Sequence, residues 1–249
     1  MEVFMKKTFF SAIIAAVLTF AAYPVVAANI DFSSAITQDD FNKLTKEAGA
    51  ALGYRNMAPA AALGITGFDV GAEFTAVSID KSSRYWNSAF GNDAPSYLVI
   101  PKIRVRKGLP FGIDVGAMYS YIPDSNVKLY GAELSKAIID GGMAAPAVGI
   151  RATYTKLAGV DDLGLQTYGI DASISKGFLF ITPYAGAGIM RINSQANGYL
   201  HTLGLKDESV TEPRVFGGVK ISPVPFLAIT AEAEYAVRPI YSLKGAISF

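Results

Sequence analysis

The sequence contains no cysteine. Disulfides, thiol catalysis, iron–sulfur clusters, thiolate zinc sites and a lipoprotein anchor are therefore excluded. It has a single histidine, His201, and no excess of charge of either sign, with 22 basic and 21 acidic residues. Because nucleic-acid binding depends on a basic surface, this balance gives no support to a nucleic-acid partner.

Long apolar runs are also missing. The longest, residues 9–22, is shorter than the roughly 20 residues that a helix needs to span a bilayer, and no later segment approaches that length. Nevertheless, 51% of the residues are apolar, and the mean hydropathy is +0.31. A secreted chain this apolar, with only short apolar runs between polar residues, places its hydrophobic side chains in strands.

Residues 1–28 have the parts of a secretory signal peptide. Two lysines precede the apolar run, and small residues follow it at positions 25–28. This order predicts cleavage after Ala27 or Ala28, with an uncleaved membrane anchor as the alternative. The peptide carries two basic residues and one acidic residue, so its removal leaves 20 of each sign and a net charge of zero.

After residue 67, segments alternate apolar and polar side chains, as strands of a lipid-embedded barrel do. In residues 111–121 one face carries Phe111, Ile113, Val115, Ala117, Tyr119 and Tyr121, and the other carries Gly112, Asp114, Gly116, Met118 and Ser120. A helical period of about 3.6 residues would mix these two sets. The alternation therefore predicts strands with one face toward lipid and the other toward a lumen.

Ten segments satisfy the same test: residues 68–79, 97–107, 111–122, 127–139, 146–156, 165–175, 178–192, 212–222, 226–237 and 240–249. Short connections alternate with longer ones, as periplasmic turns and extracellular loops do in outer-membrane barrels. The sequence therefore predicts an all-β fold, a transmembrane antiparallel up-and-down β-barrel of about ten strands over residues 67–249. Eight or twelve strands would follow if a hairpin were split or missed. An even number returns both ends of the barrel to the periplasm.

A separate element precedes the barrel, within residues 29–66. Thr37, with Asp40 three residues later, is typical of a helix start. Apolar residues then fall on one helical face, at Phe41, Leu44, Ala48 and Leu52. We expect a periplasmic helix that is too short and too polar to span a membrane. The Ala- and Gly-rich residues 54–66 are either a lead-in to the first strand or a plug that enters the lumen.

The predicted last strand ends on an aromatic residue, and its apolar face carries Tyr241, Leu243, Ile247 and Phe249. Together with the signal peptide, the alternating strands and the segment ITPYAGAGI at 181–189, this ending resembles the small outer-membrane β-barrel proteins of Gram-negative bacteria. The resemblance implies a place in the outer membrane, contact with its lipid and lipopolysaccharide, and insertion by the barrel-assembly machinery, which recognises such a strand. It implies no substrate, because function depends on the site rather than on the fold.

Fourteen charged residues fall on the predicted inward faces, seven acidic and seven basic: Asp69, Glu73, Lys102, Arg104, Arg106, Asp114, Glu133, Arg151, Asp171, Arg214, Lys220, Glu232, Glu234 and Lys244. Because buried charges need partners, they are expected to form lumenal ion pairs that close the barrel. A conducting constriction built from rings of opposite sign is the alternative, and the sequence does not place residues in rings.

Inward apolar residues are expected to cluster near the extracellular end, above most of these charges: Val77, Ile79, Leu98, Ile100, Met118, Val127, Leu129, Met190 and Phe216. They could form an apolar vestibule for a lipid-like or aromatic compound. Alternatively, the long loops fold inward over them, because exposed apolar patches are normally covered.

An enzymatic role has little support in the sequence. His201 lies in a long outer loop, and Asp161 and Asp162 lie in the preceding outer loop, so a constellation at the rim is topologically possible. No metal cluster, phosphate loop or nucleophile motif accompanies it, and we expect no catalytic residues, no metal and no cofactor. The sequence favours a non-enzymatic barrel, either a narrow or plugged channel for small or apolar solutes or a structural protein.

Overall fold

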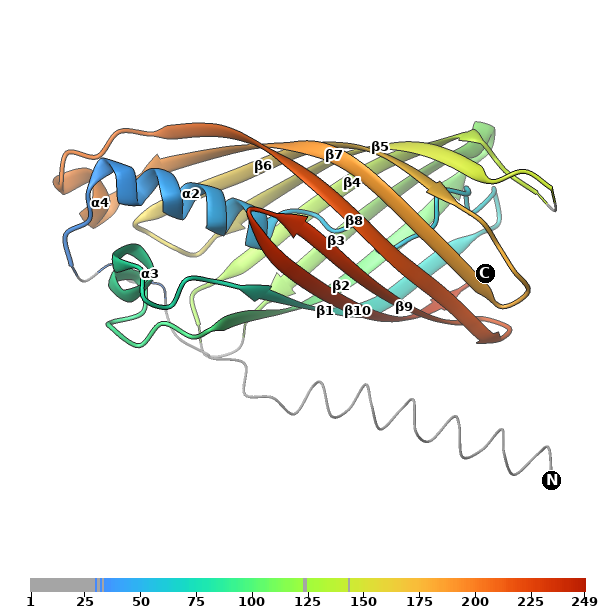
Figure 1. Cartoon of the computed structure of the whole chain (residues 1–249), viewed down its shortest axis with the longest axis horizontal. Helices are drawn as coiled ribbons and strands as arrows, with labels where there is room; N and C mark the ends of the chain where they lie inside the picture. The colour runs from blue at the N-terminus through green and yellow to red at the C-terminus, as the bar shows by residue number, and fades with distance from the viewer. Residues whose placement is uncertain (1–29, 31, 33, 123–124, 143) are drawn as a thin grey trace, which may run out of the picture.

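The computed structural model describes residues 30, 32, 34–122, 125–142 and 144–249, and it is a closed barrel of ten antiparallel strands (Figure 1). The strands are β1 (Phe68–Ser78), β2 (Tyr97–Leu109), β3 (Ile113–Tyr121), β4 (Lys128–Ile139), β5 (Ala147–Ala158), β6 (Leu163–Ser175), β7 (Ile181–Ala196), β8 (Glu208–Val224), β9 (Leu227–Ala236) and β10 (Arg238–Ser248). Neighbours in sequence pair with one another, and β1 pairs with β10. The predicted ten-stranded barrel is confirmed, whereas the predicted signal peptide lies outside the described residues.

The alternation in the sequence decides which side chains are buried. On β3, Asp114, Met118 and Ser120 are buried, whereas Val115 and Tyr119 are exposed on the outside of the barrel. Successive side chains of a strand point to opposite faces, so every strand contributes one set to the lumen and one to the exterior.

The two ends of the barrel differ in their connections. One end, the short-turn end, holds tight turns and the carboxy terminus (Figure 1). The other, the long-loop end, holds α3 (Arg84–Ala89) between β1 and β2 and α4 (Gly198–Thr202) between β7 and β8. At this end β7 and β8 are longer than predicted, because they continue to pair as far as Ser194 and Glu208.

The barrel exterior is apolar, with an aromatic band at each end. Exposed tyrosines lie toward the long-loop end: Tyr97, Tyr119, Tyr121, Tyr130, Tyr168, Tyr235 and Tyr241. Exposed phenylalanines lie at the short-turn end: Phe111, Phe178, Phe180, Phe226 and Phe249. Aliphatic side chains such as Ile103, Leu134 and Ile170 are exposed between the bands. This distribution is typical of a barrel that crosses a membrane.

The helix α2 (Gln38–Leu52) precedes the strands and begins where predicted. The Thr37 hydroxyl accepts a hydrogen bond from the Asp40 NH at 3.2 Å, and the Asp40 carboxylate accepts one from the Thr37 NH at 3.1 Å. The helix lies against the inner wall at the long-loop end, where the Thr45 and Ser194 hydroxyls are 2.5 Å apart (Figure 1). Among the described residues, no helix is long and apolar enough to cross a membrane.

From α2 the chain continues through the lumen to the short-turn end, where β1 begins. The Ile30 NH donates to Asn126 in a loop at the long-loop end. The Leu63 NH donates to Asp114 near the short-turn end. Residues 34–67, which we call the lumenal segment, therefore run the length of the barrel. This differs from the expected periplasmic helix, because the apolar face of α2 and the peptide groups that follow it meet complementary side chains on the inner wall.

Candidate functional site

The fourteen charged residues assigned to the lumen lie on the inward faces of the strands. Thirteen are buried, and Lys220 is partly buried. Twelve of them take part in ion pairs. Glu232 and Lys220 instead form hydrogen bonds, with the Tyr184 hydroxyl at 2.8 Å and the Ser248 hydroxyl at 2.9 Å. Nine of the twelve are joined by ion pairs into one network of both signs rather than two separate rings. Glu234 pairs with Arg55, and Asp69 pairs with Lys244, apart from this network.

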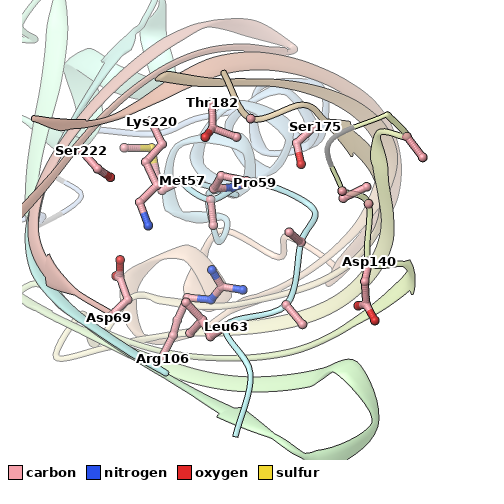
Figure 2. Close-up of a pocket in the computed structure, with 18 of the residues that line it drawn as sticks. Met57, Pro59, Leu63, Asp69, Arg106, Asp140, Ser175, Thr182, Lys220 and Ser222 are labelled. Atoms are coloured by element: carbon pink, nitrogen blue, oxygen red, sulfur yellow. The ribbon is translucent and has the colours of Figure 1, made fainter. Parts of the chain in front are cut away.

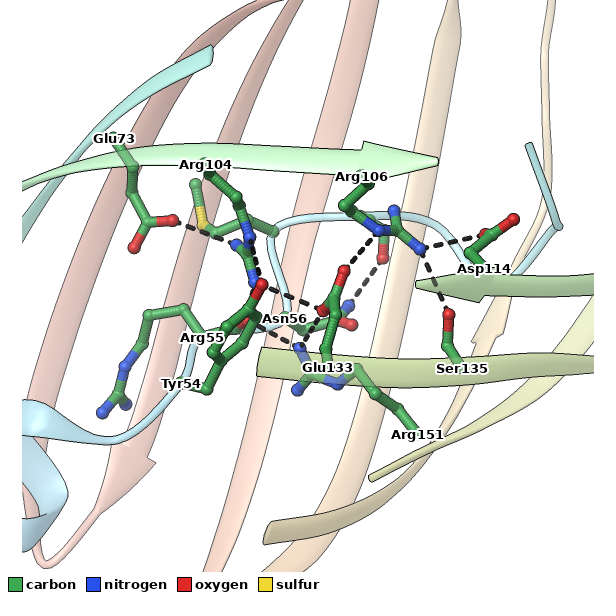
Figure 3. Close-up of polar contacts among 12 residues, drawn as sticks. Tyr54, Arg55, Asn56, Glu73, Arg104, Arg106, Asp114, Glu133, Ser135 and Arg151 are labelled. Carbon is green, nitrogen blue, oxygen red and sulfur yellow. Dashed lines mark hydrogen bonds and ion pairs between the residues drawn. The ribbon is translucent and has the colours of Figure 1, made fainter. Parts of the chain in front are cut away.

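On one side of the lumen, carboxylates of β1 and β4 bridge basic residues of β2. Glu73 accepts hydrogen bonds from Lys102 at 2.9 Å and from Arg104 at 3.0 Å. Glu133 lies 3.4 Å from Arg104 Nη2 and 2.5 Å from Arg106 Nε (Figure 3). Because each carboxylate serves two cations, removal of one would leave two buried cations short of a partner.

On the opposite side, Asp171 of β6 holds two arginines. It accepts hydrogen bonds from Arg151 Nε at 3.1 Å and from Arg214 Nε at 2.6 Å. Arg151 also lies 3.6 Å from Glu133, which joins the two sides of the network. We call the charges of β1, β2, β4, β5, β6, β8 and β9 at this level the mid-lumen cluster: Glu73, Arg104, Glu133, Arg151, Asp171, Arg214 and Glu234.

Two residues of the lumenal segment complete the cluster, and sequence reasoning missed both. Tyr54 is fully buried, with the Arg104 guanidinium 4.3 Å from the centre of its ring. The Arg55 guanidinium pairs with Glu234 and donates to the carbonyl of Ala50. At the level of the mid-lumen cluster, the lumen is filled by the lumenal segment and its charged partners.

The carbonyl groups of the segment accept hydrogen bonds from arginines of the wall. The Arg55 carbonyl accepts from Arg104 Nη2 at 2.5 Å and from Arg151 Nη1 at 2.6 Å (Figure 3). The Tyr54 carbonyl accepts from Arg214 Nη1 at 2.8 Å. Buried peptide groups outside helices and sheets need such partners. The wall arginines therefore have two roles: they pair with the wall carboxylates, and they donate hydrogen bonds to the irregular backbone of the lumenal segment.

The NH groups of the segment donate to wall acids in the same way. The Met57 NH donates to Glu232 at 2.9 Å, and the Leu63 NH donates to Asp114 at 3.0 Å. Glu232 has no ion-pair partner among the described residues, and its carboxylate accepts hydrogen bonds from the NH groups of Asn56 and Met57 and from the Tyr184 hydroxyl. Several residues that were predicted simply as lumenal charges therefore bind the backbone of the lumenal segment.

Inward-facing glycines make room for the segment, and they are the signal that could have revealed it. A Cβ atom at Gly131 would lie 2.8 Å from Tyr54 Cδ2, and one at Gly149 would lie 2.9 Å from the carbonyl oxygen of Ala60. Distances this short would force the segment to shift. Glycine weakens a strand interior and often marks the close approach of another backbone.

The predicted apolar vestibule is occupied by a helix. Val77, Ile79, Ile100, Met118, Leu129, Met190 and Phe216 are buried, and Leu98 is partly buried. Most of them, with Val127, form one hydrophobic cluster with Phe41, Leu44 and Ala48 of α2. The expected set of residues is present, and both α2 and the long loops cover it, the loops through residues such as Val160 and Leu200. Trp86 of α3 completes it.

Two of the cavities beside the lumenal segment lie next to the lumenal charges and in the predicted vestibule. The inner cavity, about 360 Å³, lies toward the short-turn end and is lined by Met57, Pro59, Arg106, Lys220 and Lys244, among others (Figure 2). Lys244 pairs with Asp69 there at 2.9 Å. The outer cavity, about 50 Å³, lies in the predicted vestibule and has an almost wholly apolar lining. The segment thus separates a polar space from an apolar one.

The rim constellation considered for catalysis is not assembled. His201 lies in α4 and is exposed, and no hydrogen bond joins its ring to Asp161 or Asp162 in the described part of the chain. Asp162 instead accepts a hydrogen bond from the NH of Tyr199 at 2.7 Å. The described residues contain no group of His, Cys, Asp and Glu that could hold a metal ion.

The residues proposed as an assembly signal lie on the outside of β10. Tyr241, Ile247 and Phe249 are exposed, and Leu243 is partly exposed. The ring of Phe249 lies 3.9 Å from that of Phe68, and the backbones of the two residues exchange hydrogen bonds. The aromatic end therefore closes the barrel at the β1–β10 junction, and its recognition by the assembly machinery stays a prediction.

Comparisons with known proteins give weak similarities only. No protein-family model matches the chain, and no curated protein matches it. Similar solved structures include OprG of Pseudomonas aeruginosa, at 7% identity and a TM-score of 0.39 over 77% of this chain and 99% of that one. The β domain of the Bordetella autotransporter BrkA has 12% identity and a TM-score of 0.36 over 74% and 100%. Ail of Yersinia pestis has 12% identity and a TM-score of 0.31 over 74% and 97%. Values this low assign neither a family nor a function to the chain.

Proposed function

We propose that this protein is an integral β-barrel of a Gram-negative outer membrane and acts as a plugged channel for small solutes, closed at rest by its lumenal segment. The apolar exterior with an aromatic band at each end supports the membrane placement. The proposal includes no enzymatic step. Placement is tested by fractionation, in which the mature protein should appear in the outer membrane with heat-modifiable migration on gels. Soluble protein in the periplasm would contradict it.

The observation that carries the closed state is the mid-lumen cluster with Tyr54 and Arg55 at its centre. Both side chains are buried, and their carbonyl groups are bound by arginines from β2, β5 and β8. Buried ion pairs and the side chains of Tyr54 and Arg55 occupy this section of the lumen, which supports a closed resting state. We therefore expect the resting protein to conduct no measurable current.

Two features support a plug that can be displaced rather than a permanent core. The inner cavity of about 360 Å³ reaches the segment from the short-turn end. The stretch at 58–64 consists mainly of alanine, with proline and glycine, so it packs few large side chains against the wall. Its contacts are hydrogen bonds such as that from the Ala60 NH to Ser175 at 3.0 Å, which water can replace.

Single-channel recording in planar bilayers tests the proposal. The full mature chain should be silent, whereas Tyr54→Ala/Arg55→Ala should show openings, because the two large side chains that the lumenal segment places in this section are removed. Leu63→Ala, a change in the same segment below the cluster, is the matched control and should stay silent. Steady openings of the unmodified protein would contradict a plug that is closed at rest.

A purely structural barrel is the second candidate, and the close packing of α2 in the outer half favours it. It predicts that the double variant either stays silent or loses its fold. Heat-modifiable migration of the double variant separates these outcomes, since a folded, silent double variant would support the structural role over the channel.

A further inference from the structure

The barrel rim has a notch between β2 and β3. This ladder is the shortest of the ten, with seven registered pairs against fourteen between β7 and β8. It ends at the pair Ile103 and Tyr119, although β2 continues to Tyr97. On its other side β2 stays paired with β1 along its whole outer part, from Lys102 to Tyr97. Among the residues that the structure describes, the outer part of β2 therefore has a registered neighbour on one side only.

Local chemistry explains why the pairing stops. Residue 101 is a proline, which has no NH to donate and is tolerated only at strand edges. Its carbonyl instead accepts a hydrogen bond from the side-chain hydroxyl of Ser120 at 2.5 Å. Just beyond Tyr121 the chain turns, with a hydrogen bond from the Ile122 NH to the carbonyl of Val127 at 3.3 Å. The β3–β4 hairpin therefore ends closer to the short-turn end of the barrel than β2 does.

The outer cavity lies at this notch and is lined from both faces of β2. Tyr97 and Val99 belong to the outward face, and Leu98 and Ile100 belong to the inward face, yet all four line the same space. The cavity therefore lies between the outer part of β2 and the apolar face of α2, where Leu44 lines its lumenal side.

We propose that the outer cavity receives the end of a hydrocarbon chain of an outer-leaflet lipid, which enters sideways through the β2–β3 notch. The notch borders Tyr119 and Tyr121 of the tyrosine band, the level at which aromatic side chains meet the membrane interface. Its lining is apolar, and such cavities exclude water and accept apolar guests. A space of about 50 Å³ fits the end of an unbranched chain rather than a fused ring.

The inward end of the cavity is closed by charge. Lys102, next on the inward face of β2 below Ile100, is buried in its ion pair with Glu73 at 2.9 Å. A chain end would therefore stop above the mid-lumen cluster, because an apolar group gains nothing by displacing a buried ion pair. The inference depends on the proposed membrane placement but not on the channel role.

Trp86 gives a direct readout of the cavity. It is the only tryptophan of the chain, it is 2% exposed, and it lines the outer cavity. Its indole NH donates to Glu47 at 2.7 Å, which fixes the ring. Full mature protein is reconstituted in phosphatidylcholine brominated on its acyl chains, because bromine quenches indole fluorescence at contact. We expect stronger quenching than in unbrominated lipid, despite the burial of Trp86.

Variants locate the route. Ala48→Leu should fill the cavity while keeping α2 helical and should abolish the quenching. Since the chain has no native cysteine, Val99→Cys/Tyr121→Cys, which keeps Pro101 in place, can be joined across the notch by a short bifunctional thiol-reactive reagent. The quenching should be present before this reaction and abolished after it. The matched control is Tyr154→Cys/Tyr168→Cys, a directly registered pair on the closed β5–β6 ladder, which should keep the quenching after cross-linking.

Three outcomes would overturn the inference. These are absence of quenching in the unmodified protein, quenching that survives the cross-link across the notch, and quenching by a brominated free fatty acid but not by brominated lipid. The last would assign the cavity to a free alkyl compound. Channel recordings on the same preparations test the proposed function separately. Absence of lipid quenching would not contradict the plugged channel, and absence of channel openings would not contradict the lipid site.

Discussion

The two halves of the lumen are filled by the same segment in opposite ways. In the outer half, α2 packs Phe41, Leu44 and Ala48 against apolar side chains of the wall. In the inner half, the chain beyond Gly53 is irregular and is bound by charged groups such as Arg104 and Glu232. The change from apolar to charged wall occurs where the helix ends.

The difference follows from the needs of the backbone. A helix satisfies its own NH and carbonyl groups by internal hydrogen bonds, so it needs only apolar neighbours to be stable when buried. A segment outside helices and sheets has few internal partners for its NH and carbonyl groups, and burial of such groups without partners is costly. The chemistry of the inner wall therefore matches the secondary structure of the segment that it surrounds.

The largest effect is expected in the charged half, from Arg55→Met. Loss of the guanidinium would leave Glu234 buried without its ion-pair partner, and breaking a buried pair by removal of one member costs about 3–5 kcal/mol of unfolding free energy. Urea titration of the protein in phospholipid vesicles measures the loss. Arg55→Met/Glu234→Gln should recover most of it, because no unpaired charge remains. A double variant as unstable as the single one would show that the pairing is not what holds this half.

In the apolar half, Leu44→Ala should cost less, about 2 kcal/mol, the lower end for a buried leucine, because Leu44 already borders the outer cavity. The same urea titration applies, and the loss should not change with salt. Lys43→Ala, on the neighbouring exposed face of α2, is the control and should be near neutral. A strong salt dependence of the Leu44→Ala effect would break the distinction between the two halves.

The smallest effect is expected at the start of α2, where Thr37→Ala removes a helix cap worth about 1 kcal/mol. Burial raises the pKa of Asp40, but hydrogen bonds from Thr37 and the charges of Arg84 and Lys43 outweigh it, so the pKa lies below its usual value. The ionised form is thus favoured in the folded state, and its contribution is lost as pH falls through that lowered pKa. Urea titration at decreasing pH should show a smaller loss of unfolding free energy in Thr37→Ala than in the unmodified protein. The same pH profile in both would exclude the cap as the source of the loss.

The strands and the inward charges were predictable because both depend on a period of two residues. Arg104 and Glu133, for example, could be assigned to the lumen from their neighbours alone. The position of α2 could not, because its helical pattern is the same whether it packs inside or outside the barrel. Tyr54 and Arg55 follow no period, and their partners lie on strands distant in sequence. The composition of residues 54–66 allowed a plug as one of two interpretations, and inward glycines such as Gly131 are a second indication that the lumen holds more than side chains.

The direction of the lumenal segment constrains how the barrel can be assembled. The segment runs from the long-loop end to the short-turn end and then reverses into β1, so it and β1 form one long hairpin with its tip near residues 64–67. A closed barrel offers no slot through which such a hairpin could enter later from the side. Unless its amino-terminal end threads through the lumen afterwards, the segment is in place before Phe68 and Phe249 join. Closure of the last seam then fixes the plug and the wall in a single step.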